Sequence, residues 1–129
     1  AQSRPFVVFT GGEPLLQLDQ DTVNAVHKRG FEIAIETNGT VTPPQGIDWI
    51  CCSPKGTALA ITSGDELKFV FPQLKLQPKD FEHLDFKMFY LQPMDGPERT
   101  RNVRLSIDYC LQNPQWQLSL QLHKILDIP

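Results

Sequence analysis

Five short polar clusters contain most of the side chains that could do chemistry in this sequence. Each follows an apolar run of strand length: Thr10–Glu13, Glu36–Asn38, Ser53–Lys55, Gln92–Asp95 and Gln121–His123. In parallel α/β sheets and barrels, the carboxyl ends of the strands meet on one face, where ligands bind. Ordinary loops also contain polar residues, so a single cluster would be ambiguous. Together, the five clusters predict one shared site.

The sharpest of these clusters is Gly11-Gly12-Glu13-Pro14. Two glycines remove the Cβ atoms at the end of a strand, so a ligand can approach the backbone closely. Glu13 adds a carboxylate suited to an ammonium group through a charge-assisted hydrogen bond. A Gly-Gly turn beside a solvated glutamate is also common, and this alternative stays open.

The polar clusters are positioned by predicted strands that alternate with helices or long connecting segments. Apolar runs predict strands at 6–10, 31–36, 47–52, 66–71, 87–91 and 116–121. A helix is predicted between Asp19 and Gly30, a turn or two of helix at 78–84, and a helix over 98–112. The apolar positions of the last helix are Val103, Ile107, Cys110 and Leu111, which predicts its buried face.

Apolar strands joined by long crossovers imply a mostly parallel sheet with right-handed connections. About six strands with few full helices predict an α/β fold, an incomplete barrel that forms a single domain over residues 1–129.

Composition and charge exclude several classes of protein. The 129 residues carry a net charge of −3 without clustered Lys and Arg, which argues against a nucleic-acid partner. No apolar run approaches the roughly 20 residues of a membrane span. Three cysteines, two of them adjacent, do not make a disulfide framework, so we expect a reducing cytoplasm. Because the chain lacks an initial Met and enters a strand within a few residues, we expect a segment upstream of it.

Several motifs resemble those of known enzymes. The stretch Val7–Pro14 resembles the second-strand motif of radical S-adenosylmethionine enzymes. The remaining motifs resemble, in order and spacing, the 7-carboxy-7-deazaguanine synthases of queuosine biosynthesis: Ile35–Gly39, Asp48–Ile50, Ser53–Lys55, Glu66–Lys68, Leu91–Gly96 and His123–Lys124. This resemblance covers nearly the whole chain and implies a partial barrel of the radical S-adenosylmethionine type.

The resemblance implies two sets of binding residues. The set for S-adenosylmethionine is Gly12, Glu13, Ser53, Pro54, Lys55, Gln92, Pro93, Met94 and Asp95. The set for a pterin substrate is Thr10, Glu36, His123 and Pro129. A terminal carboxylate on Pro129 would accept hydrogen bonds from the amino edge of the pterin. His123 could equally be a histidine that packs or caps in the tail.

The family's three-cysteine cluster motif and its magnesium ligand are not found in these residues. Cys51 and Cys52 are strand neighbours that point to opposite faces, and Cys110 lies on the apolar stripe of a helix. We therefore expect the 4Fe-4S cluster and Mg²⁺ to be held by a missing N-terminal segment, and this chain alone to be inactive.

For the intact protein, the resemblance implies conversion of 6-carboxy-5,6,7,8-tetrahydropterin to 7-carboxy-7-deazaguanine with loss of ammonia. It also implies an electron donor such as flavodoxin or ferredoxin, and a homodimer. Two alternatives stay open: a truncated, non-catalytic homologue that binds S-adenosylmethionine or a partner, and a barrel hydrolase that uses Glu13 and Glu36 as an acid–base pair.

Overall fold

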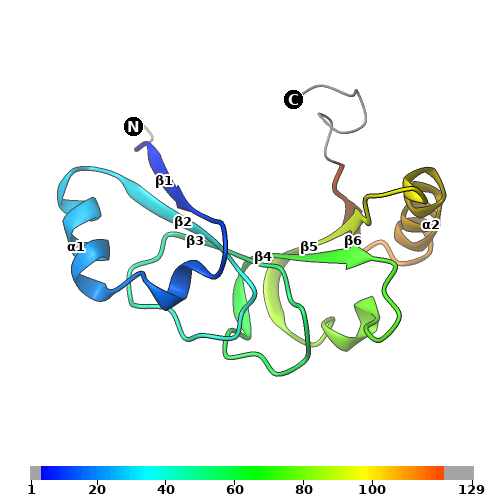
Figure 1. The fold of residues 1–129 in the computed structure, drawn as a ribbon, viewed down its shortest axis with the longest axis horizontal. Coiled ribbons are helices and arrows are strands. Elements are labelled where there is room, and N and C mark those ends of the chain that lie inside the picture. Colours follow the sequence, from blue (N-terminus) through cyan, green and yellow to red (C-terminus); the bar gives the residue numbers. More distant parts are fainter. Residues whose placement is uncertain (1–3, 121–129) are drawn as a thin grey trace.

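The sheet of this protein is parallel throughout the part that the structure describes. A computed structural model describes residues 4–120. They form six strands in chain order: β1 (Phe6–Phe9), β2 (Glu32–Thr37), β3 (Trp49–Cys52), β4 (Ser63–Phe71), β5 (Asp85–Pro93) and β6 (Trp116–Leu118). Every neighbouring pair of these strands is parallel. The sheet bends into an open arch (Figure 1), as expected for a barrel that is not closed. The predicted α/β partial barrel with six strands is therefore confirmed.

Helices are few and lie towards the two ends of the arch (Figure 1). The two α-helices are α1 (Gln20–Lys28) and α2 (Arg99–Gln112), and two 3₁₀ turns are η1 (Pro14–Leu16) and η2 (Pro78–Asp80). Asp19 caps α1 as predicted, because its carboxylate accepts the backbone N–H of Thr22 at 2.8 Å. No helix among residues 4–120 is both long enough and apolar enough to cross a membrane.

One face of the sheet carries the hydrophobic core. Alternate residues of β2 and β4 are buried, together with Cys52 of β3 and Leu91 of β5. They pack with side chains of η1, α1, the connecting loops and β6, and the main members of this core are Leu15, Val23, Ile33, Ile35, Cys52, Ile61, Leu67, Phe69, Phe81, Leu91 and Trp116. Because strand side chains alternate between faces, the intervening residues point to the other side of the sheet. That second face includes Glu36, Cys51 and Glu66.

Strands β4 and β5 are longer than the apolar pattern predicts. The pairing begins at Ser63 with Asp85, before the predicted starts at residues 66 and 87. The polar residue Asp65 is buried within this extension because its partners satisfy its carboxylate. It accepts the backbone N–H of Ile50 at 2.8 Å and pairs with the Lys87 ammonium at 3.0 Å. Such long-range partners are invisible in a local pattern.

The predicted buried face of α2 is wrong in part. Ile107 is 39% exposed and Leu111 is 77% exposed, whereas Asn102 and Ser106 are buried. The Asn102 side-chain amide donates to the Met94 carbonyl at 3.0 Å, and the Ser106 hydroxyl donates to the Asn102 carbonyl at 2.7 Å. These bonds satisfy the buried polar atoms, so the helix can turn a small polar face to the sheet.

Candidate functional site

The carboxyl ends of β1, β2 and β3 lie next to one another and enclose a cleft of about 260 Å³. Its lining joins residues from the loops after these three strands: Gly11, Gly12, Glu36, Thr37, Asn38, Ser53 and Lys55. The structure thus brings together Gly12, Ser53 and Lys55 of the predicted S-adenosylmethionine set, together with Glu36 of the predicted substrate set. Their roles as ligand contacts stay predictions.

The Gly-Gly turn forms an open wall of this cleft. Gly11 and Gly12 have φ values of 76° and 31°, a backbone conformation that residues with a Cβ rarely adopt. A Cβ placed at either position would meet no atom within 4 Å. The glycines are therefore required by the backbone conformation, and their peptide groups are open to a ligand.

The Glu13 carboxylate is held by donors of its own chain. Oε1 accepts the Thr37 hydroxyl at 2.7 Å and the Asn38 backbone N–H at 2.8 Å. Oε2 lies 2.8 Å from the same hydroxyl and accepts the backbone N–H of Leu15 at 2.9 Å. Glu13 also caps the 3₁₀ turn η1. The hydrogen bonds of the Glu13 carboxylate therefore connect the loop after β1 to the end of β2.

A second hollow of about 750 Å³ continues from the cleft along the ends of β3, β4 and β5. Lys55 lines both spaces, and Met94 lines the second one. The Met94 backbone N–H donates to the Phe71 carbonyl at 2.8 Å, which fixes the chain after β5 against the end of β4. The rest of the lining comes from two loops: Gly56, Thr57 and residues 72–76.

The other predicted residues are placed differently. Thr10 lines a separate hollow of about 450 Å³ that involves β1, η1 and α1. Pro54 is buried, and Gln92 and Pro93 are the last two residues of β5. The Asp95 carboxylate lies 3.7 Å from the Arg99 guanidinium. The remaining two predicted substrate contacts, His123 and Pro129, lie outside the described residues.

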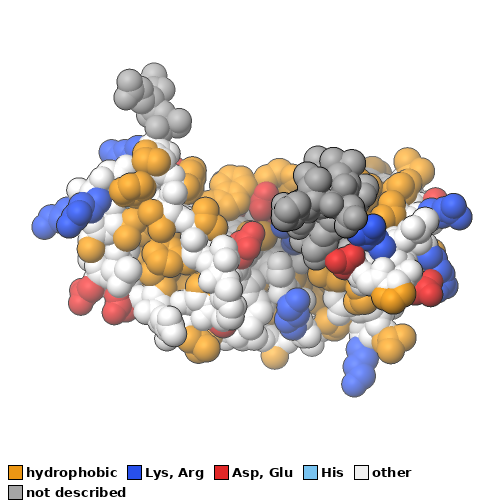
Figure 2. All heavy atoms as spheres, turned by 45° about the horizontal axis from the view of Figure 1, so that its top comes forward, with side chains coloured by type: hydrophobic (Ala, Val, Ile, Leu, Met, Phe, Trp, Pro, Cys, Tyr) orange, Lys and Arg blue, Asp and Glu red, His pale blue; other side chains and the backbone are white. Residues whose placement is uncertain are grey.

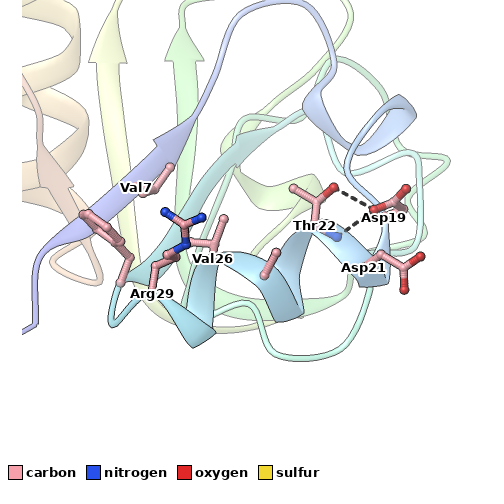
Figure 3. Close-up of a pocket in the computed structure, with 8 residues that line it drawn as sticks. Val7, Asp19, Asp21, Thr22, Val26 and Arg29 are labelled. Carbon is pink, nitrogen blue, oxygen red and sulfur yellow. Dashed lines mark hydrogen bonds between the residues drawn. The ribbon is translucent and has the colours of Figure 1, made fainter.

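A further groove of about 490 Å³ lies between β1 and α1 (Figure 3). Val7, Val26 and Phe31 contribute apolar side chains to it. Asp19 and Thr22 are at its rim, and their hydrogen bonds to each other cap the helix (Figure 3). The groove contains none of the residues predicted to bind a ligand.

The face of the sheet opposite the core has a polar row beside the cleft. Glu36, Cys51 and Glu66 are partners in adjacent strands and so point to the same side. Desolvation by burial raises the pKa of Cys51 to about 12, with the Glu66 and Glu36 carboxylates acting in the same direction and Lys68 opposing them. Figure 2 shows the hollowed side of the molecule with acidic side chains near its middle. The sequence did not predict this row.

The described residues do not offer ligands for an iron–sulfur cluster or a magnesium ion. Within residues 4–120, no group of three or more His, Cys, Asp or Glu side chains is arranged to hold a metal. Cys51 and Cys52 are buried, and Cys110 lies apart from them on α2. Burial also raises the pKa of Cys52 to about 11, so its thiol is protonated at neutral pH.

Thr37 is the residue that sequence reasoning missed. It is 3% exposed, lines the cleft and binds the Glu13 carboxylate. Its hydroxyl also accepts the Gly39 backbone N–H at 3.1 Å. The only signal in the sequence was the place of Thr37 inside the motif Glu36-Thr37-Asn38-Gly39.

The fold and the cleft define the class of protein: an incomplete parallel α/β barrel with a cleft at the carboxyl ends of β1, β2 and β3. Comparison with known proteins then narrows the class. The chain is 60% identical over 124 residues to the 7-carboxy-7-deazaguanine synthase of Caulobacter vibrioides, covering 95% of this chain and 59% of that protein. It is 59% identical over 125 residues to the Bordetella pertussis enzyme of the same name, covering 96% of this chain and 60% of that protein.

Among solved structures, the chain resembles the crystal structure of QueE from Escherichia coli. The TM-score is 0.67 at 28% identity, covering 90% of this chain and 56% of that one. No family model matches the sequence. The resemblance to 7-carboxy-7-deazaguanine synthases is confirmed, and the fold is that of a partial barrel of this type. The chain spans about 60% of the length of these relatives.

Proposed function

We propose that the protein containing this chain is a 7-carboxy-7-deazaguanine synthase. It converts 6-carboxy-5,6,7,8-tetrahydropterin to 7-carboxy-7-deazaguanine by radical ring contraction with loss of ammonia. The observation that carries the proposal is the identity of 59–60% over at least 95% of the chain to relatives with this name. The cleft supports this proposal, because its lining brings together the motifs that resemble those of the family.

The cleft suits S-adenosylmethionine in its shape and charge. Open peptide groups at Gly11 and Gly12 and the ammonium of Lys55 face a space that continues toward Met94. The glycine backbone would receive the amino-acid part, Lys55 and Ser53 would bind polar oxygens, and Met94 would pack against the adenosine part. Once reduced by one electron from the 4Fe-4S cluster, bound S-adenosylmethionine would break a carbon–sulfur bond, release methionine and supply the carbon radical that removes a hydrogen atom from the substrate.

The polar row suits the pterin substrate. Carboxylates at Glu36 and Glu66 can accept the paired N–H groups of a pterin ring. Thr10, in its separate hollow beside η1 and α1, would reach the substrate only from the other side of β1. The strands keep these groups in fixed positions, and the sheet excludes water from one side. The chain's own contribution is therefore to bind and orient both molecules.

Other parts of the function depend on the rest of the protein. In the proposal, the 4Fe-4S cluster and Mg²⁺ are held by residues other than 4–120, because no fitting ligand set is found within that range. The electron donor is a flavodoxin or ferredoxin, and the enzyme works as a homodimer in the cytoplasm. In the same proposal, His123 and Pro129 also contact the substrate.

The test is an anaerobic assay of the full-length protein for 7-carboxy-7-deazaguanine, combined with calorimetry of S-adenosylmethionine binding. Lys55→Met should weaken that binding by about 1.5–3 kcal/mol, as for a lost charged hydrogen bond. Lys79→Met is the matched control, because Lys79 is also exposed but lies on η2 and lines neither the cleft nor the second hollow.

Three outcomes separate the possibilities. Product formation together with a selective effect of Lys55→Met supports the enzyme. Binding of S-adenosylmethionine without any turnover, with cluster and reductant present, would favour the non-catalytic homologue. If the wild-type protein binds no S-adenosylmethionine, or if both lysine variants behave alike, the cleft has been assigned wrongly.

A further inference from the structure

The Glu13 carboxylate was expected to meet the ammonium group of a ligand, but its surroundings indicate another role. Thr37, Asn38 and Leu15 supply three hydrogen-bond donors to its two oxygens at 2.7–2.9 Å. A carboxylate has about four acceptor positions, so most of its capacity is already used. Glu13 is also not among the residues that line the cleft, whereas the preceding residue Gly12 and the hydrogen-bond partner Thr37 both line it.

The direction of these bonds can be deduced from Thr37. Its hydroxyl oxygen accepts the Gly39 backbone N–H at 3.1 Å, so its single proton is free to point at Glu13. The chain of bonds therefore runs from the Gly39 amide through the Thr37 hydroxyl to the Glu13 carboxylate. Because Thr37 is 3% exposed, water does not replace the hydroxyl when it is removed.

The loop that this carboxylate holds is the one with the open glycines. Glu13 directly follows Gly12, and its partners at Thr37 and Asn38 are at the end of the neighbouring strand β2. In the part of the chain that the structure describes, the carbonyl oxygens of Gly11 and Gly12 accept no hydrogen bond. These oxygens, rather than the occupied carboxylate, are the free acceptors in the turn.

We propose that Glu13 and Thr37 are positioning residues: their hydrogen bonds clamp the Gly11-Gly12 turn to the end of β2 and so hold the backbone of the turn in the conformation that the ligand meets. Thr37 is then as important for binding as Glu13 itself. This inference rests on the proposed function, because it takes S-adenosylmethionine as the ligand. It differs from the simpler assignment in which the Glu13 charge contacts the ligand directly.

Thr37→Val separates the two roles, because it removes the hydroxyl and leaves the Glu13 charge in place. The clamp predicts that Thr37→Val and Glu13→Gln each weaken S-adenosylmethionine binding by roughly tenfold or more, by calorimetry on the full-length, cluster-loaded protein. The double variant should be no worse than either single one, since both remove the same interaction. Thr37→Ser keeps the hydroxyl and should bind nearly as the wild type does.

A second probe distinguishes the clamp from a general loss of structure. Methylthioadenosine contains the adenosine part of S-adenosylmethionine but not its amino-acid part. The clamp predicts that its affinity changes less than twofold in Thr37→Val and Glu13→Gln, because only the glycine turn is displaced. A parallel loss for both ligands would mean a merely structural role and would overturn the inference.

Hydrogen exchange of Glu13→Gln gives an answer even if Thr37→Val does not fold. Without ligand, the amides of Leu15, Asn38 and Gly39 should exchange faster than in the wild type, because each depends on the clamp. Unchanged exchange, or wild-type affinity in a folded Thr37→Val, would show instead that the Glu13 charge serves the ligand directly. Failure of the wild type to bind S-adenosylmethionine would refute the proposed function itself.

Discussion

Gly39 follows the clamp residues and provides the sharpest test of the packing around the site. Its φ of +83° is a left-handed conformation, and a Cβ there would lie 2.7 Å from Cys52 Sγ and 3.1 Å from Leu59 Cδ2. Cys52 is fully buried, so its sulfur has little room to move. Gly39→Ala therefore combines backbone strain with overpacking of the core.

The expected loss of stability can be calculated from these two effects. The left-handed backbone costs about 1–2 kcal/mol for a residue with a Cβ, and overpacking a core costs about 1–3 kcal/mol. The sum is about 2–5 kcal/mol, less about 0.4–1 kcal/mol gained because alanine restricts the unfolded chain. The assay is urea denaturation of the full-length protein followed by circular dichroism, with the midpoint and slope compared to the wild type.

Gly30 provides a matched control for this experiment. Its φ of +88° is almost the same, but a Cβ there would meet no atom within 4 Å. Gly30→Ala should therefore show the strain alone, and the difference between the two variants should be about 1–3 kcal/mol. Equal losses for Gly30→Ala and Gly39→Ala would refute the close packing of Gly39 against Cys52 and Leu59.

Two further predictions follow from titratable groups. Burial raises the pKa of Cys51 to about 12 and that of Cys52 to about 11. Iodoacetamide should therefore label the less buried Cys110 first in the native protein. Equal labelling of the three cysteines, measured by peptide mass spectrometry, would contradict this prediction. Burial alone would raise the pKa of Asp48, but hydrogen bonds from the Ile33 N–H and a histidine lower it below 3.8. Asp48 therefore stabilises the fold above about pH 4 and stops doing so as the pH falls through its folded pKa. Denaturation midpoints of Asp48→Asn and the wild type should converge in acid, and a constant difference would show that the charge is not involved.

The six strands along the chain, their parallel arrangement and the polar clusters at their carboxyl ends could be predicted from the sequence. All three depend on local patterns: apolar runs of strand length, crossovers between them, and a polar cluster at each strand end. The turn at Gly11-Gly12 could also be predicted, because a backbone with positive φ favours glycine and so shows in the residue type itself. A parallel sheet follows from these features before any contact is known.

Contacts between distant residues decided the rest. The sequence neighbours of Glu13 could not reveal that its carboxylate accepts the hydroxyl of Thr37, which is 24 residues away. In the same way, the predicted strand began only at residue 66 because the local pattern could not show that Lys87 pairs with Asp65. Likewise, α2 buries Asn102 because its side-chain amide donates to the Met94 carbonyl. The sequence by itself determined which residues are polar and where strands end. Only the tertiary structure decided which polar groups satisfy one another and which remain open to a ligand, because a buried polar group is stable only beside a partner that folding brings to it.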